Sequence, residues 1–311
     1  MREGVGKMHL MTIAIHSSPK MISILIPAYN NVKSLQRALT HLSEQSISEK
    51  LTVIISDDCS PNLSIRDLSD IKNQFEVFFK ELFTFKQPHN LGVMSNKEWL
   101  YRQVSTKYFA FHEHDDWIIN KMFYEFSLGL LEINKEACCF FGNAIIGQQP
   151  NENITEPLLF KNNWMYDFNQ KAPLENKDYS ILEGIDMVKS LINSSPQCPF
   201  NTSWSALVLR KEYVDSIGGF ASNYALTVFE ASLLNVYREE EHFAFLYFLA
   251  SSYNFIIEKV PSVIRGWDIN SFSRSRTNPT RKFKQDSSYY AFYKLVYFIN
   301  NHNTKRKDKQ Y

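Results

Sequence analysis

From Met21 onward, short apolar runs alternate with longer amphipathic segments along the chain. The run from Ile22 to Pro27 has the composition of a buried strand that ends at proline, and Leu51 to Ser56 forms a second such run. Between them, Asn31 can cap a helix whose apolar face is formed by Leu35, Ala38, Leu39 and Leu42. This alternation predicts βα units and a mostly parallel sheet.

The same pattern continues through the rest of the chain. We expect further helices over 64–79, after the turn at 90–92 and over 119–131, and further strands over 82–86, 108–112 and 137–141. Residues 147–178 are polar and are predicted to form a long loop over the sheet. Ser180 and Glu183 match a capping box for a helix that continues through Ile192. A strand over 205–209, a short helix, a Gly-Gly-Phe turn at 218–220 and a helix from about residue 228 follow.

Two pairs of adjacent carboxylates come directly after predicted strands. Asp57 and Asp58 follow the second strand, and Asp115 and Asp116 follow the fourth. Ligands of open parallel sheets bind beyond the carboxyl ends of the strands. Adjacent carboxylates repel each other unless a cation or hydrogen-bond donors offset the charge, and Mg²⁺ or Mn²⁺ held together with substrate phosphates would do so. For any single pair, an Asx turn or a helix N-cap is the structural alternative.

Five segments, taken in order, resemble the motifs of family 2 glycosyltransferases. They are Ser23–Asn31, Val53–Ser60, Asn90–Val93 with Asn96, Phe109–Trp117 and Ile217–Phe220. The resemblance extends from Met21 to about Arg238. It implies a GT-A type α/β fold, with a Rossmann-like, mostly parallel sheet flanked by helices and a C-terminal helical, aromatic extension.

This resemblance also implies a division of the chain. Residues 1–20 form an irregular N-terminal segment. Residues 21–135 form the half that binds a nucleotide-sugar, and 136–260 form the acceptor-binding half of the same GT-A domain. Residues 261–311 are a basic, aromatic C-terminal extension.

The resemblance assigns roles to particular residues on the donor side. Pro27, Ala28 and Tyr29 would line the nucleotide pocket, with Tyr29 stacking on the base, although a core position is the alternative for this ring. Asp58 would accept a hydrogen bond from the base, commonly uracil in the family, and Asn96 belongs to the nucleotide-binding set. Asp115 and Asp116 would hold the ribose and the cation, Mn²⁺ or Mg²⁺, that bridges the diphosphate.

On the acceptor side, the family places an acidic general base shortly after the Gly-Gly-Phe turn, which makes Glu230 the candidate. A glutamate favoured by the dipole at a helix start is the alternative. Three departures from the family matter. Glu113 stands where many members have the first Asp of Asp-x-Asp, and Ala231 follows Glu230 where many have Asp. Cys59 replaces a glycine, which is tolerable if this residue need not adopt a positive φ.

For several other polar residues near these motifs, the sequence leaves a functional and a structural alternative. By strand alternation His112 and His114 point to one face and Glu113 and Asp115 to the other. His114 is a candidate pyrophosphate or acceptor contact, with packing as the alternative. Arg265 and Arg274 fall where members place a flexible segment closing over the diphosphate, or they belong to a basic surface loop.

Charge is unevenly distributed over the chain. The formal net charge is +1, but residues 261–311 contain eleven Lys/Arg and three Asp/Glu, which leaves −7 for the first 260 residues. This basic tail with its aromatic run would suit peripheral contact with a membrane, or it packs on the catalytic domain as a solvated segment. Four cysteines without zinc-ligand spacing and the lack of a 20-residue apolar run favour a cytoplasmic protein, for which a peripheral position on the inner face of the membrane is one alternative.

The sequence therefore predicts a metal-dependent, inverting glycosyltransferase. A UDP-sugar is the favoured donor, the acceptor is a glycan or glycolipid of bacterial surface polysaccharide or lipooligosaccharide synthesis, and no nucleic acid is involved. A degenerate nucleotide-sugar-binding protein is one alternative. A sugar nucleotidyltransferase is another, although residues 27–31 lack the Gly- and Arg-rich loop of that class. A dehydrogenase is disfavoured because no GxGxxG follows the first strand.

Overall fold

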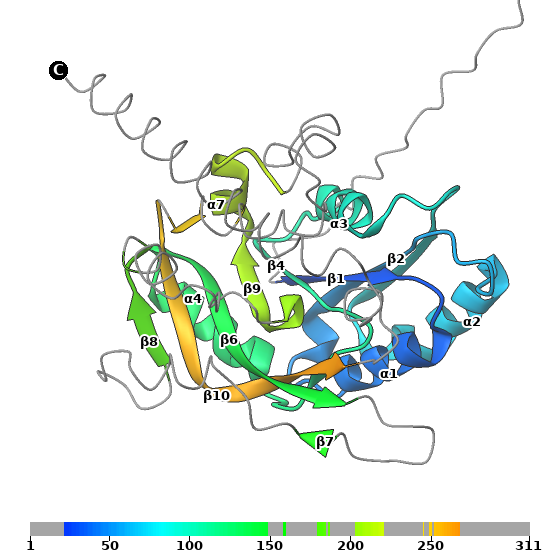
Figure 1. The fold of residues 1–311 in the computed structure, drawn as a ribbon, viewed down its shortest axis with the longest axis horizontal. Helices are drawn as coiled ribbons and strands as arrows, with labels where there is room; N and C mark the ends of the chain where they lie inside the picture. The colour runs from blue at the N-terminus through cyan, green and yellow to red at the C-terminus, as the bar shows by residue number, and fades with distance from the viewer. Residues whose placement is uncertain are drawn as a thin grey trace, which may run out of the picture.

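The computed structural model describes residues 22–148, 158–159, 179–184, 186, 203–220, 245, 249–250 and 252–267. Its first half is a regular βα succession: β1 (Ile22–Ala28), α1 (Val32–Ser43), β2 (Leu51–Asp57), α2 (Ile65–Phe75), β3 (Glu81–Lys86), α3 (Val93–Arg102) and β4 (Tyr108–Phe111). Short 3₁₀ turns at Ser48–Lys50 and Glu76–Phe78 precede β2 and β3. The strands lie in the order β3-β2-β1-β4 and all pair in parallel, as predicted (Figure 1).

The second half continues the same sheet with mixed pairing. It contains β5 (Trp117–Ile118), α4 (Phe123–Ile133), β6 (Ala137–Gln148), β7 (Leu158–Leu159), β8 (Tyr179–Leu182), a 3₁₀ turn η3 (Trp204–Ala206), β9 (Leu207–Arg210), α7 (Lys211–Ser216) and β10 (Asn254–Trp267). The order continues from β4 through β9, β6 and β10 to β5. Because β9 is antiparallel to both β4 and β6, the described sheet is mixed beyond β4, although β6 and β10 pair in parallel.

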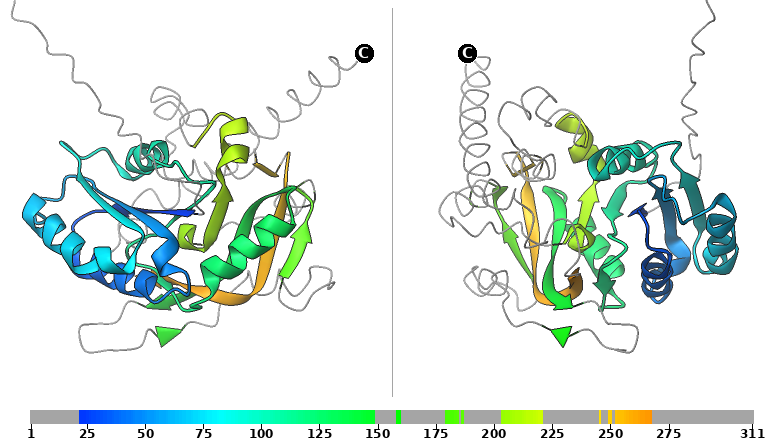
Figure 2. Two further views of the ribbon diagram at one scale, coloured as in Figure 1. Left: turned by 180° about the vertical axis from the view of Figure 1, so that it is seen from behind. Right: turned by 45° about the vertical axis from the view of Figure 1, so that its right-hand side comes forward.

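Helices cover both faces of this sheet (Figure 2). Alternation along β1 sends Ile22, Ile24 and Ile26 toward α1, α2 and α4, and Leu25 toward α3 and α7. The predicted face of α1 is confirmed, since Leu35, Ala38, Leu39 and Leu42 are all fully buried. Its predicted cap is also present, because the Asn31 side chain accepts a hydrogen bond from the Ser34 N–H at 3.0 Å.

Three predictions near the second half are wrong because long-range strand pairing overrides the local signal. Ser180 does not cap the expected helix, since it lies in β8, which pairs antiparallel with residues 255–258 of β10; Gly184 and Asp186 are helical, and the rest of that expected helix lies outside the described residues. The helix expected from residue 119 begins at Phe123, because the N–H groups of Ile119 and Asn120 donate to the Ser262 carbonyl beside β10. Arg265 does not lie in a flexible segment but in β10, opposite Ile146 of β6.

Strand β10 also crosses the segment boundary expected at residue 261, so the sheet continues to Trp267. In the described part of the chain, no helix combines the length and the apolar composition that a membrane crossing requires.

Candidate functional site

The carboxyl ends of β2, β1 and β4 meet at one edge of the sheet. β1 lies between β2 and β4, so the strand order reverses there, and a crevice for a ligand forms at such a switch point. The Asp58 N–H donates to the Ala28 carbonyl at 2.9 Å, and the His112 N–H donates to the Leu25 carbonyl at 2.8 Å. Both acidic pairs predicted from the sequence therefore flank the end of β1.

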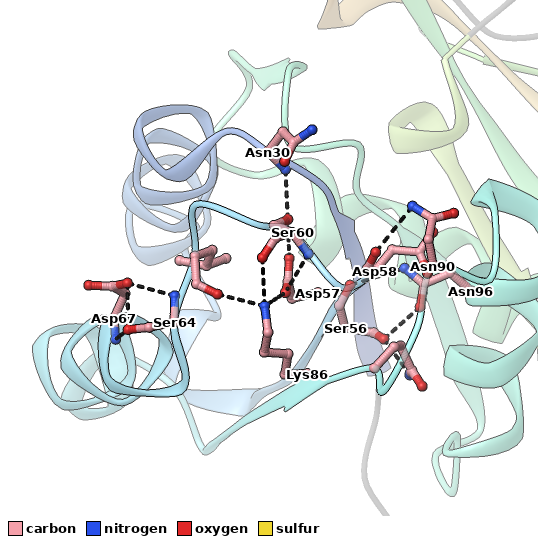
Figure 3. A network of polar contacts seen from close by, with 12 residues as sticks. Asn30, Ser56, Asp57, Asp58, Ser60, Ser64, Asp67, Lys86, Asn90 and Asn96 are labelled. Atoms are coloured by element: carbon pink, nitrogen blue, oxygen red, sulfur yellow. Dashed lines mark hydrogen bonds and ion pairs between the residues drawn. The ribbon is translucent and has the colours of Figure 1, made fainter.

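Asp57 holds the loop after β2 together (Figure 3). Its carboxylate is fully buried, accepts hydrogen bonds from the backbone N–H and the hydroxyl of Ser60, and pairs with the Lys86 ammonium at 2.9 Å. Lys86 also donates to the carbonyls of Ser60 and Leu63, at 2.7 and 2.6 Å. Asp57 therefore makes the turn that was the structural alternative, and its negative charge is offset within the protein.

Asp58 has quite different surroundings. Its carboxylate accepts hydrogen bonds from the backbone N–H groups of Leu91 and Gly92, at 2.6 and 3.0 Å. Burial raises its pKa, while these two donors act in the opposite direction. Each carboxylate oxygen has a second lone pair, so a hydrogen bond to a nucleotide base remains compatible with these contacts and stays a prediction.

Two non-glycine residues adopt left-handed backbone conformations at this edge, Asn30 with φ 61° and Cys59 with φ 62°. The Asn30 N–H donates to the Ser60 hydroxyl at 2.8 Å and so links the two loops. Asparagine tolerates this conformation, whereas cysteine does not favour it. The condition under which Cys59 would replace glycine without cost is therefore not met.

Replacing Cys59 with glycine is expected to increase the free energy of unfolding by about 0.5–1 kcal/mol. The relief of left-handed strain, roughly 1–2 kcal/mol, exceeds the extra entropy of glycine in the unfolded chain. Urea denaturation measures the difference, and Cys59→Ala is the control because it removes the thiol but keeps the strain. Equal stability of the two variants would contradict this explanation.

Asn96 is buried and links α3 to β2. Its amide N–H donates to the Ser56 carbonyl at 3.0 Å, and its amide oxygen accepts from the Ser56 hydroxyl at 2.6 Å (Figure 3). The Gln87 amide donates to the same hydroxyl at 2.8 Å. These contacts favour a positioning role for Asn96, and direct contact with a nucleotide stays a prediction.

Residues 113–116 form a turn between β4 and β5, which we call the acidic turn. It is closed by a hydrogen bond from the Asp116 N–H to the Glu113 carbonyl at 3.0 Å, so neither Asp115 nor Asp116 caps a helix. Asp116 is buried and accepts hydrogen bonds from the hydroxyls of Ser203 and Ser205, the latter at 2.8 Å. Burial, together with the charges of Asp115 and Glu113, raises the pKa of Asp116 to about 7.

This donor set fits a divalent cation that is shared with a diphosphate. Within the described residues, no three His, Cys, Asp or Glu side chains form a complete metal site. Mg²⁺ is commonly held by one or two carboxylates together with substrate phosphates, and Mn²⁺ accepts the same oxygen ligands. A cation at Asp115 and Asp116 would also relieve the crowding of charge that raises the pKa of Asp116.

Two cations that the sequence did not single out lie beside the acidic turn. The Arg37 guanidinium on α1 stacks over the Trp117 ring, 4.8 Å from its centroid, and interacts electrostatically with Asp115. The Lys97 ammonium on α3 pairs with Glu113. Neither residue belongs to a local motif, because each is brought to the turn by a helix that lies distant in sequence.

Neither of the two histidines at the acidic turn is exposed: His112, just before it, is buried, and His114, within it, is half-buried. His112 is fully buried, and neither ring nitrogen has a hydrogen-bond partner among the described residues. Burial lowers its pKa to about 3. His114 hydrogen-bonds to the backbone of Pro27, necessarily to its carbonyl since proline has no N–H, and burial lowers its pKa as well. Packing is thus the better interpretation for His112, and contact of His114 with a diphosphate stays a prediction.

His112 should make the protein sensitive to acid. The unfolded chain takes up a proton near pH 6.5, but the folded chain does so only near pH 3, so stability is lost as the pH falls between these values. Relative to His112→Phe, the wild type should lose up to about 1.4 kcal/mol per pH unit in this range, as measured by urea denaturation. The exposed residue His89, changed to asparagine, is the control. Parallel pH profiles of wild type and His112→Phe would contradict the assignment.

The structure describes some of the remaining predicted site residues and leaves others outside the described ranges. Pro27 and Ala28 lie at the end of β1, and the Tyr29 side chain is 44% exposed, so it is not a core aromatic and is accessible for stacking. The Gly-Gly-Phe turn is present, with φ values of 105° and 94° at its glycines, and Phe220 is buried. Glu230 and Arg274 lie outside the described residues, and for Arg265 only the backbone is described.

Comparison with known proteins agrees with this architecture. The curated processive diacylglycerol beta-glycosyltransferase of Mycoplasma genitalium is 25% identical over 173 residues, which cover 48% of this chain and 50% of that protein. Staphylococcus aureus TarS 1–349, solved with UDP-GlcNAc, has a TM-score of 0.53 at 12% identity, with 90% of this chain and 65% of that chain covered. The mannosyltransferase PcManGT from Pyrobaculum calidifontis, solved with GDP-Man and Mn²⁺, has a TM-score of 0.52 at 12% identity, with 83% and 59% covered.

The chain thus spans about half the length of the curated relative and about six-tenths of the solved ones. At such low identity the solved structures show the fold alone, and they confirm the predicted GT-A-like α/β sheet flanked by helices. The family model described as glycosyl transferase family 2 matches residues 23–183, just over half of the chain. This chain belongs to glycosyl transferase family 2.

Proposed function

We propose that this protein transfers a sugar from a nucleotide-diphosphate donor to an acceptor hydroxyl. One observation carries the proposal: Asp58 and the acidic turn lie on either side of the end of β1, where the strand order reverses. In this arrangement Asp58 would lie toward the base, and Asp115 and Asp116 toward the diphosphate of the same ligand. Tyr29, with its exposed ring, lies at the end of the strand between them.

The charges at this edge support a donor with a diphosphate leaving group. Asp115 and Asp116 would hold Mn²⁺ or Mg²⁺, and such a cation offsets the negative charge that grows on the diphosphate as the glycosidic bond breaks. Arg37, on α1, would stabilise the negative charge of Asp115. A UDP-sugar is the favoured donor by resemblance to the family; the TarS neighbour was solved with UDP-GlcNAc and the PcManGT neighbour with GDP-Man, so both nucleotides enter the test.

The proposed reaction inverts the anomeric centre. The acceptor hydroxyl attacks in line, and the carboxylate of Glu230 takes its proton. Glu230→Gln should abolish transfer while leaving nucleotide binding intact. If transfer survives, Glu230 is not the base. If the wild type binds donors but shows no transfer with any acceptor, the degenerate binding protein becomes the better description.

The acceptor is proposed to be a glycan or a glycolipid of the bacterial cell surface. The Mycoplasma genitalium relative, whose name specifies diacylglycerol, supports a lipid-linked acceptor. The basic segment that follows β10, residues 268–311, would then provide peripheral contact with anionic lipid on the cytoplasmic face of the membrane.

A thermal-shift screen tests the proposed function. UDP-, GDP-, dTDP- and CMP-sugars are compared, each with and without Mn²⁺. A donor present at a hundred times its Kd stabilises the folded state by about 2.7 kcal/mol, so the true donor should raise the Tm clearly, and more so with Mn²⁺. A Tm that no donor changes, with or without the metal, would contradict the proposal.

A further inference from the structure

Lys97 is a buried cation that none of the family motifs explains. It lies on α3, and its side chain is only 3% exposed. Its ammonium pairs with the carboxylate of Glu113, whose side chain is 25% exposed and which is the first residue of the acidic turn. Burying an unpaired ammonium costs free energy. The fold that buries Lys97 therefore requires its partner Glu113, which distinguishes this ion pair from an exposed surface contact.

Aromatic rings enclose the Lys97 ammonium. It lies 4.9 Å from the centroid of the Trp204 ring and 5.6 Å from that of Phe111. Phe220 of the Gly-Gly-Phe turn packs against both rings, with centroids 4.9 Å from Phe111 and 5.5 Å from Trp204. A cation over aromatic faces is stabilised further, and this enclosure holds the ammonium at one position beside the turn.

The backbone of Glu113, whose carboxylate forms the ion pair, is connected to Asp116 by a chain of hydrogen bonds. The Glu113 N–H donates to the Ser205 hydroxyl at 2.8 Å, and this hydroxyl donates to the Asp116 carboxylate at 2.8 Å. The Ser203 hydroxyl accepts from the Ser205 N–H at 2.9 Å and donates to the same oxygen of Asp116. Any displacement of Glu113 would therefore be transmitted to the carboxylate proposed to hold the cation.

We propose that Lys97 is a positioning residue of the metal site, acting through Glu113 and Ser205 on Asp116. This role rests on the proposed function. It also accounts for the departure at Glu113. The carboxylate at the first acidic position of the Asp-x-Asp pattern is paired with Lys97 and would stabilise the turn, while Asp115 and Asp116 would hold the cation. Lys97 thereby offsets one of the three carboxylate charges of the turn.

Mn²⁺ binding measured by electron paramagnetic resonance in the presence of UDP tests this role directly. Lys97→Met keeps the length of the side chain but leaves Glu113 without its partner, and it should weaken Mn²⁺ affinity by about tenfold or more, the usual effect of losing a residue that orients a metal ligand. Lys97→Arg should restore most of the affinity. In Lys97→Met/Glu113→Gln the unpaired carboxylate is absent, so the combined loss should be smaller than the sum of the two single losses.

Lys107→Met is the matched control, because Lys107 forms an exposed ion pair with Glu132 at 2.7 Å. It should leave Mn²⁺ affinity unchanged. If Lys97→Met does not fold, Glu113→Gln carries the test, since it preserves the shape of the side chain and should also weaken Mn²⁺ binding.

The outcomes separate the two proposals. A wild type that binds UDP and Mn²⁺, together with a folded Lys97→Met or Glu113→Gln of equal Mn²⁺ affinity, would overturn the positioning role alone, even if the Tm falls. A wild type that binds no Mn²⁺ with any donor nucleotide would overturn the proposed function and this role with it.

Discussion

Replacing Asp115 with asparagine should lower the rate of sugar transfer by at least about a hundredfold. Asparagine preserves the shape of the side chain but removes the charge that a divalent cation needs, at the place where negative charge develops on the leaving diphosphate. The backbone of the acidic turn is closed by Glu113 and Asp116, so the variant should fold normally. The initial rate of nucleotide release with the donor found by thermal shift measures the effect.

The control for this variant is Asp70→Asn on α2, an exposed carboxylate distant in sequence from the turn, which should retain the wild-type rate. If the rate of Asp115→Asn is close to that of this control, Asp115 does not take part in catalysis.

Replacing Lys86 with methionine should lower the free energy of unfolding by about 3 kcal/mol. Asp57 is fully buried, and without Lys86 its charge would remain in the interior with Ser60 as its one side-chain partner among the described residues. The carbonyls of Ser60 and Leu63 would lose a donor as well. Urea denaturation measures the loss, and Asp57→Asn combined with Lys86→Met should recover part of it.

The exposed pair between Lys107 and Glu132 provides the comparison for Lys86. Lys107→Met should cost less than about 1 kcal/mol, since solvent screens exposed ion pairs. If Lys86→Met costs no more than Lys107→Met, the loop after β2 does not depend on a buried ion pair.

The first half of the fold could be predicted because its signals are local. The Asn31 cap and the apolar face of α1 lie within a dozen residues, and β1 and β2 are continuous apolar runs that a doubly covered sheet requires. The positions of Asp58 and of the acidic turn at the ends of β2 and β4 followed from the same pattern.

The second half could not be predicted as well because its strands are defined by distant partners. β8 became a strand through pairing with β10, more than seventy residues later, and this overrode the capping signature at Ser180. β6 extends to Gln148 for the same reason, since it pairs with β10 along most of its length.

The side chains that position the acidic turn could not be predicted from the sequence either. Lys97 and Ser205 reach Glu113 from separate elements, and no spacing in the sequence reveals a contact of this kind. The backbone conformation of Cys59 stayed open at the level of sequence, because cysteine itself gives no signal for the positive φ that the structure shows.

The central claim is that the acidic turn binds a divalent cation together with the diphosphate of the donor. A crystal structure with UDP and Mn²⁺, in which anomalous scattering locates the manganese, tests it most directly. We predict manganese coordinated by a carboxylate oxygen of Asp115 or Asp116 and by oxygens of the diphosphate. UDP bound at the end of β1 with no manganese at these carboxylates, or manganese bound elsewhere, would contradict the claim.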